Sequence, residues 1–92
     1  MKKHQQADDL FEQLGFDREE AANLRLRSEI MNALIAEIEK RGLAQAQAEV
    51  GVSQPRISDL MREKLHLFSL DTLVTLLSRL GLRVVMKVKR AA

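Results

Sequence analysis

The fold of this chain is decided by the stretch GVSQPRISDL, which runs from Gly51 to Leu60. Gly51 can adopt the left-handed conformation that ends many helices, and Ser53 is a good N-cap for a helix that follows. Pro55 then falls in the first turn of that helix, where its missing N–H costs nothing. Two interpretations of the corner are open: an ordinary connection between helices, or a corner whose second helix must lie against something outside the protein.

The residues on either side of this corner predict two short helices. The segment LAQAQAEV, residues 43–50, contains no helix breaker and fits about two helical turns. After the corner, Ile57, Leu60 and Met61 have the spacing of one apolar helix face, and this helix is expected to end near Arg62 or Glu63. A short helix, a turn containing glycine and a second helix with a polar outer face match the description of a helix-turn-helix.

A further helix is expected on each side of this pair. Asp17 followed by Glu20 has the spacing of a capping box, and the apolar pattern then continues to Arg41, as one helix or as two nearly joined. Ser69 caps the last helix, which Gly81 terminates. The positions of this last helix expected to face the core are Leu70, Leu73, Val74, Leu77 and Leu80.

After Gly81 the apolar pattern changes to a period of two with β-branched residues, which is typical of a strand. No second strand is evident in the sequence, so the partner of this strand is expected outside the subunit. The symmetric choice is its own copy, paired antiparallel across a two-fold axis, and a different partner protein stays open. The residues expected at such a dimer contact are Leu82, Val84, Val85, Met86 and Val88.

These patterns divide the chain into three parts. Residues 1–16 are expected to form a flexible N-terminal arm, in which Leu10, Phe11, Leu14 and Phe16 make a small apolar cluster. Residues 17–81 are expected to form the helix-turn-helix DNA-binding domain, and residues 82–92 the dimerisation strand and tail.

Composition excludes several classes of function. The 92 residues include no cysteine, which removes disulfides, thiolate metal sites and cysteine nucleophiles and suits a reducing cytoplasm. His4 and His66 have no acidic residue or second histidine at ligand spacing, and no serine has a His–acid pair to activate it. We therefore expect no catalysis, metal, cofactor or small-molecule substrate. No apolar run reaches the roughly 18 residues of a membrane span, and the start MKKHQQADD lacks the apolar segment of a signal peptide, so a cytoplasmic location is expected.

The charges are distributed unevenly along the chain. Residues 1–40 hold six Lys and Arg against nine Asp and Glu, whereas residues 41–92 hold nine against four. The basic half contains the helix-turn-helix pattern. This asymmetry makes a polyanion partner plausible for the second half, although solvated charged faces also explain such a distribution.

The stretch GVSQPRISDL, followed by REK and by FSLDTLVTLLSRLGLRV, resembles the Xre group of regulators, relatives of lambda repressor and Cro, and most closely the small HigA-type antitoxins. The resemblance covers roughly residues 10–90. It implies a mainly α, lambda-repressor-like bundle of four to five helices with one C-terminal β-strand that pairs across a dimer. It also implies a homodimer on a palindromic double-stranded DNA operator, which represses its own promoter and neutralises a RelE-like ribonuclease toxin.

The resemblance assigns roles to particular residues. In the family the second helix of the motif, here residues 54–62, enters the major groove, where a glutamine amide can bond adenine and a carboxylate can accept from cytosine. The positions matching base-reading residues are Gln54, Pro55, Arg56 and Asp59, with Arg56 pointing to the groove or to a phosphate. The positions that fit phosphate contacts are Ser53, Ser58, Arg62, Lys64 and Gln45. The buried frame that fixes the angle between the helices is Val50, Val52, Ile57 and Leu60.

Two positions depart from the family pattern. Gln47 stands four residues before Gly51, where the family usually has alanine, so a shortened or shifted first motif helix stays open, and with it the phosphate contact of Gln45. Glu63 stands after the groove helix, where the family mostly has glycine, and its negative charge near DNA is mildly unfavourable.

Two classes of function therefore compete. The first is a dimeric, sequence-specific repressor. The second is a protein–protein interaction module in which the acidic, apolar arm of residues 8–24, or the terminal strand, caps the active site of a basic toxin. The two functions are compatible in one protein, and an orphan regulator without a toxin partner is a further alternative.

Overall fold

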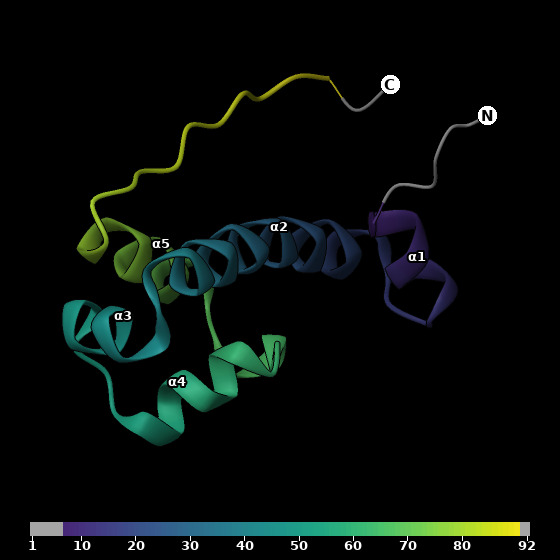
Figure 1. Cartoon of the computed structure of the whole chain (residues 1–92). Helices are drawn as coiled ribbons and strands as arrows, with labels where there is room; N and C mark the ends of the chain where they lie inside the picture. The colour runs from purple at the N-terminus through teal and green to yellow at the C-terminus, as the bar shows by residue number, and fades with distance from the viewer. Residues whose placement is uncertain (1–6, 91–92) are drawn as a thin grey trace.

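The computed structural model describes residues 7–90, with the side chains of residues 10–90. Over these residues the chain is a bundle of α-helices (Figure 1). The elements are α1 (Ala7–Gln13), α2 (Arg18–Arg41), α3 (Leu43–Val50), α4 (Gln54–Met61), the 3-10 turn η1 (Leu65–Leu67) and α5 (Leu70–Arg79). In the described range, no helix combines the length and hydrophobicity that crossing a bilayer requires.

The helix ends are set by the caps that the sequence predicts. The Asp17 side chain accepts a hydrogen bond from the Glu20 N–H at 2.8 Å, which confirms Asp17 as the N-cap at the start of α2. Ser69 caps α5 in the same way, accepting from the Thr72 N–H at 3.1 Å. The segment from Arg18 to Arg41 is one continuous helix, so the alternative of two nearly joined helices is not observed.

The core lies where α2, α3, α4 and α5 meet. Buried side chains come from each of these helices and from the loop after η1, and the largest of them is Phe68. On α5 the buried residues are Leu73, Leu76 and Leu77, followed by Leu80 just after the helix. Val74, which was expected to face the core, is 39% exposed, because the apolar face of α5 starts at Leu73 and continues three, four and seven residues later.

The N-terminal region differs from the expected flexible arm. Residues 7–13 form α1, which packs chiefly against α2 at the end of the bundle remote from α3 (Figure 1). The expected apolar cluster is present in part: the Phe11 and Phe16 rings meet edge to face with centroids 6.0 Å apart. Residues 1–6 of the expected arm lie outside the described residues.

The expected C-terminal strand is not found. No residue in the range 7–90 is in a β-strand, and residues 82–90 form an extended segment without regular secondary structure, which we call the tail. The tail runs back above α2 (Figure 1). A strand is defined by hydrogen bonds to a neighbouring strand, and the helices of a single chain offer no such neighbour. The tail residue that packs against the core is Val84, which is half-buried.

Candidate nucleic-acid interface

The α3–turn–α4 unit has the geometry that the opening stretch predicts. Gly51 ends α3 with φ 70° and ψ 31°, the left-handed conformation, and its N–H bonds the Gln47 carbonyl. The Ser53 side chain then accepts from the Arg56 N–H at 3.3 Å and caps α4. Val50, Ile57 and Leu60 are 0%, 1% and 0% exposed, and Val52 is half-buried against them. This apolar frame, predicted as a set, fixes how α4 sits on the bundle.

The opposite face of α4 is open. Gln54, Pro55 and Arg62 are exposed, and Ser58 and Asp59 are half-buried. Within the described part of the chain, α1 and the tail lie at other sides of the bundle, and α4 forms its lower edge (Figure 1). A helix that buries its apolar face and presents amide, hydroxyl and guanidinium groups outward is suited to a groove of DNA.

Arg56 has a structural contact in addition to its predicted role. Its guanidinium carbon lies 4.0 Å from the centroid of the Phe68 ring, a cation–π arrangement that joins α4 to the loop after η1. Arg56 is half-buried and Phe68 is 1% exposed, so the arginine covers this ring. The guanidinium is therefore held at the side of α4, and a base contact requires it to leave the ring or to extend past it.

Asp59 and Lys64, which were expected to contact a base and a phosphate, meet each other. The Lys64 Nζ lies 3.5 Å from the Asp59 Oδ1, and both side chains remain partly accessible. An ion pair of this kind is weak in water and can be exchanged for a phosphate contact. The pair thus partly neutralises the carboxylate at the open face of α4 and places the lysine at the end of this helix.

The first motif helix settles the question that Gln47 raised. The fully buried residues of α3 are Ala46 and Val50, both at 0% exposure, and Ala46 is the small one, whereas Gln47 is half-buried. The small residue needed for close helix packing is therefore one position earlier than in the family pattern. Gln45 is exposed, and its amide donates to Glu49 at 3.5 Å.

Three arginines that hold this unit in place were not singled out by the sequence. Arg79 on α5 donates to the Val50 carbonyl at 2.7 Å, satisfying the C-terminal end of α3 directly before the turn. Arg27 on α2 donates to the Leu65 and Phe68 carbonyls, both at 3.3 Å, and fixes the loop after α4. Each contact spans 29 residues or more along the chain, so no local spacing signals it.

The third of these, Arg41, joins three helices. It pairs with Glu37 of α2 at 2.7 Å and with Glu49 of α3 at 3.0 Å, and it donates to the Leu80 carbonyl at the end of α5. The pKa of Arg41 is raised above its usual value, chiefly because its side chain hydrogen-bonds Glu37 and then Glu49. The guanidinium therefore stays charged throughout the pH range in which these contacts matter.

The other predicted residues fall outside this interface. The tail positions Leu82, Val85, Met86 and Val88 are 36%, 82%, 59% and 92% exposed, and Val84 alone of the predicted dimer residues packs on the core. Among residues 7–90, no group of three His, Cys, Asp or Glu side chains is placed to hold a metal ion.

The short helix, the glycine turn and the open face of α4 together define a helix-turn-helix domain, the class of unit with which many regulators bind DNA. The model of the family described as "Helix-turn-helix domain" matches residues 10–89, and the chain belongs to that family. The search of curated proteins and the search of solved structures each found no match.

Glu63, two residues after the end of α4, allows a direct test of the local backbone. Glu63 has φ 59° and is the one non-glycine residue with positive φ in the described range. Because a side chain at this conformation costs about 1–2 kcal/mol, Glu63→Gly should stabilise the fold, by up to about 1 kcal/mol after the greater freedom of glycine in the unfolded chain is counted. Urea unfolding measures this change, and Glu63→Ala, which removes the charge and retains the side-chain strain, is the control.

Proposed function

We propose that this protein is a homodimeric, sequence-specific transcriptional repressor of the Xre type, with α4 of each subunit in the major groove of a palindromic operator. The observation that carries this proposal is the open face of α4, with Gln54, Pro55 and the C-cap residue Arg62 exposed while Ile57 and Leu60 on the other face are buried. In a dimer the two groove helices would lie about 34 Å apart, one turn of B-DNA.

The exposure of the side chains supports a division of roles within this proposal. Gln54, at the start of α4, is the strongest candidate base reader, because its side chain is exposed and a glutamine amide can make a bidentate contact with adenine. Arg62 and Lys64, at the other end of α4, are suited to grip phosphates, and Ser53 and Ser58 flank the same surface. This proposal gives the protein no catalytic role, cofactor or small-molecule substrate.

Gln54→Ala tests this assignment. A duplex selected by the protein from a random-sequence pool serves as the operator, with single-base variants of it for comparison. The variant should lose discrimination at one base pair by roughly 1–3 kcal/mol, because one bidentate contact disappears, and it should retain its affinity for unrelated DNA. Fluorescence anisotropy titrations on the set of duplexes measure both quantities.

Lys64→Ala is the control and should weaken binding to every duplex alike. Unchanged affinity, discrimination and salt dependence in both variants would show that α4 is not the DNA-reading helix.

A second function is supported by a separate surface. The acidic half of the chain begins with α1 and the start of α2, where Leu10, Leu14 and Phe16 are 48%, 66% and 40% exposed. We propose that such a surface suits a small basic protein, as in a HigA-type antitoxin that neutralises a RelE-like toxin. A neighbouring reading frame that encodes a small basic protein, and capture of that protein by this chain with loss of capture in Leu14→Asp, test the antitoxin role. Failure of capture leaves an orphan regulator.

A further inference from the structure

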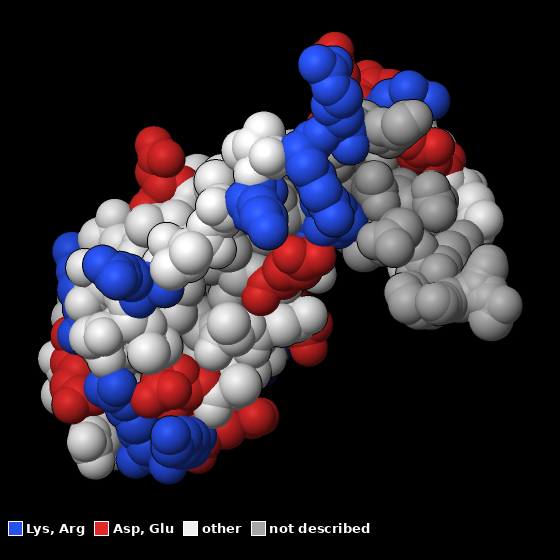
Figure 2. Space-filling view, turned by 90° about the horizontal axis from the view of Figure 1, so that it is seen from above, with Lys and Arg blue, Asp and Glu red and all other residues white. Residues whose placement is uncertain are grey.

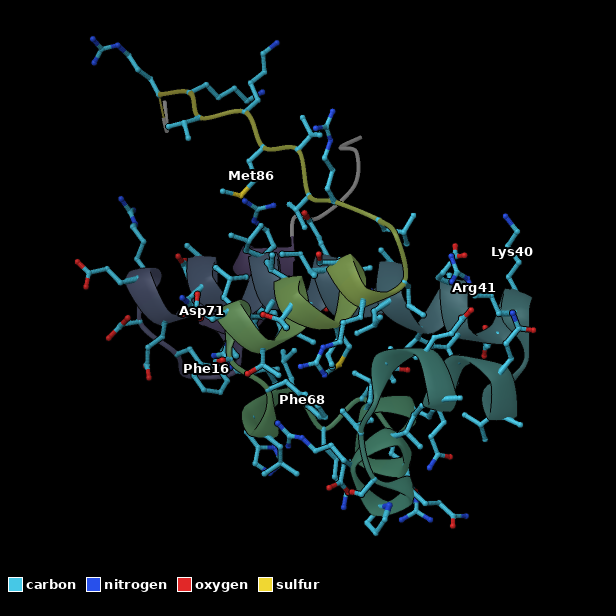
Figure 3. The ribbon with its side chains drawn as sticks, turned by 90° about the vertical axis from the view of Figure 1, so that its left-hand side faces the viewer. Phe16, Lys40, Arg41, Phe68, Asp71 and Met86 are labelled. Carbon is cyan, nitrogen blue, oxygen red and sulfur yellow. The ribbon has the colours of Figure 1, made fainter. Side chains whose placement is uncertain are left out.

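A groove lies between the tail and the bundle, on the side of the molecule opposite α4. Its volume is about 600 Å³. The lining comes from α2, from α5 and from the tail itself, and Figure 3 shows Met86 of the tail above the helices. The apolar residues that line the groove are Leu26, Ile30, Ala33, Leu77, Leu82, Val84, Val85 and Met86. The groove thus has an apolar lining large enough for several side chains of a partner.

The charged residues that line the groove are mostly basic. Arg83, Lys87 and Lys89 of the tail are exposed there, and a ridge of Lys and Arg side chains crosses the same face in Figure 2. The one acidic residue in the lining, Glu29, is paired with Arg25 at 2.7 Å. An occupant that matches both properties carries apolar side chains for the lining and carboxylates for the basic residues.

Most registers that would pair the tail with the tail of a second copy are unfavourable because of its charges. Arg83, Lys87 and Lys89 share one side of the period-two pattern. Antiparallel pairing of two tails centred on residue 85, 86, 87 or 88 places two of these cations directly opposite each other. Like charges in directly opposed positions destabilise a strand pair.

The chain contains another segment with the required chemistry. We define the α1 corner as residues 10–20. It exposes Leu10, Leu14 and Phe16, and its exposed acidic residues are Glu12, Asp17, Glu19 and Glu20. Because α1 packs chiefly against the start of α2, it extends from the bundle with this face uncovered by other described elements (Figure 1).

We propose that the groove beneath the tail binds the α1 corner of a second copy of this chain. Under two-fold symmetry each subunit both gives and receives an α1 corner, so the contact closes as a dimer. The inference rests on the dimeric form of the proposed regulator and specifies which segments meet. It replaces strand-to-strand pairing of the tails with a contact between an acidic, apolar corner and a basic, apolar groove. An α1 corner that occupies this groove is not free to bind a toxin at the same time, so the dimer contact and the toxin contact proposed above are alternative uses of this surface.

Engineered cysteines test which segments meet, because the full chain has none of its own. Leu14→Cys and Met86→Cys are made separately at exposed positions, and circular dichroism checks that each variant folds. An equimolar mixture is oxidised and the cross-linked peptides are identified by mass spectrometry. The expected product is the disulfide between residues 14 and 86. Leu43→Cys, at the exposed start of α3, is the matched control and should not cross-link to either.

The alternative outcomes overturn the proposal in distinguishable ways. Cross-links formed within the Met86→Cys variant alone, in a protein that sediments as a dimer, overturn the exchange and leave the dimeric regulator intact. A protein that sediments as a monomer on and off DNA overturns both the exchange and the dimeric form of the regulator.

Charge reversal gives a second, independent readout. Glu12→Lys and Lys87→Glu should each raise the dissociation constant of the dimer by about tenfold, because each places like charges across the contact. Sedimentation velocity measures this constant. The double variant should recover most of the loss. A double variant that is as weak as the sum of its single variants contradicts the pairing of these two surfaces. Val88→Glu, at a 92% exposed tail position outside the groove lining, is the control and should dimerise like the unaltered chain.

Discussion

Replacing Arg62 and Lys64 together by alanine should lower the affinity of the proposed dimer for any duplex by on the order of a thousandfold at about 0.1 M salt. Each phosphate contact adds a slope of about 0.9 to the dependence of log affinity on log salt concentration. In the proposed dimer, two subunits would contribute four such contacts, so the slope should fall by about 3.6 and the loss should shrink as salt rises. Lys64 is already paired with Asp59 at 3.5 Å, so the expected loss of affinity is smaller than that of four phosphate contacts made by unpaired side chains.

A net-charge control separates this local effect from a general one. Arg18→Ala combined with Lys40→Ala also removes two positive charges, from the beginning and the end of α2. Figure 3 shows Lys40 on the side of α3 away from α4. This control should change the salt slope by much less than the Arg62 and Lys64 pair. Equal changes of the salt slope in the two double variants would mean that DNA affinity depends on the total charge of the protein and not on the residues at the end of α4.

Phe68→Ala should have the largest effect on stability, a loss of about 3–5 kcal/mol in the free energy of unfolding. Phe68 is 1% exposed and is the largest of the fully buried side chains, so its removal leaves a cavity beneath α4. The contact with the Arg56 guanidinium, at 4.0 Å, is lost with it. A loss of this size is comparable with the whole stability of many small domains. Urea unfolding followed by circular dichroism measures the change.

Two further variants show what the aromatic ring contributes. Phe68→Leu keeps most of the buried apolar volume and removes the ring, so it should cost much less than the alanine variant and free the Arg56 guanidinium. Val74→Ala, at a 39% exposed position of α5, should change stability by less than about 0.5 kcal/mol. If Phe68→Ala and Val74→Ala unfolded at the same urea concentration, the loop after η1 would not belong to the core.

The local part of the fold could be predicted from the sequence because its signals are short. Asp17, Gly51, Ser53 and Ser69 each act on a backbone group within four residues, and each lies at the helix end that it was expected to set. The buried frame of α4 follows from one apolar period in the same way. The position of the buried small residue in α3 could not be read from the sequence around Gln47, and in the structure it is Ala46.

The remaining features depend on contacts that no spacing encodes. The Arg56 guanidinium lies over a ring 12 positions along the chain, and Arg79 reaches a carbonyl 29 residues away. The tail has the pattern of a strand, yet this pattern indicates only a preference for extended backbone. A strand also needs a neighbouring strand, and no other segment among residues 7–90 provides one inside the subunit.

The arrangement of Arg41 and Arg79 has a mechanical consequence. The tail leaves the bundle at Leu80, whose carbonyl is held by Arg41, and the same guanidinium is tied to Glu49 near the end of α3. One residue before this exit, Arg79 holds the Val50 carbonyl. A molecule that pulled on the tail would therefore transmit force to the turn between α3 and α4 through the polar contacts of these two arginines, without first deforming the apolar core.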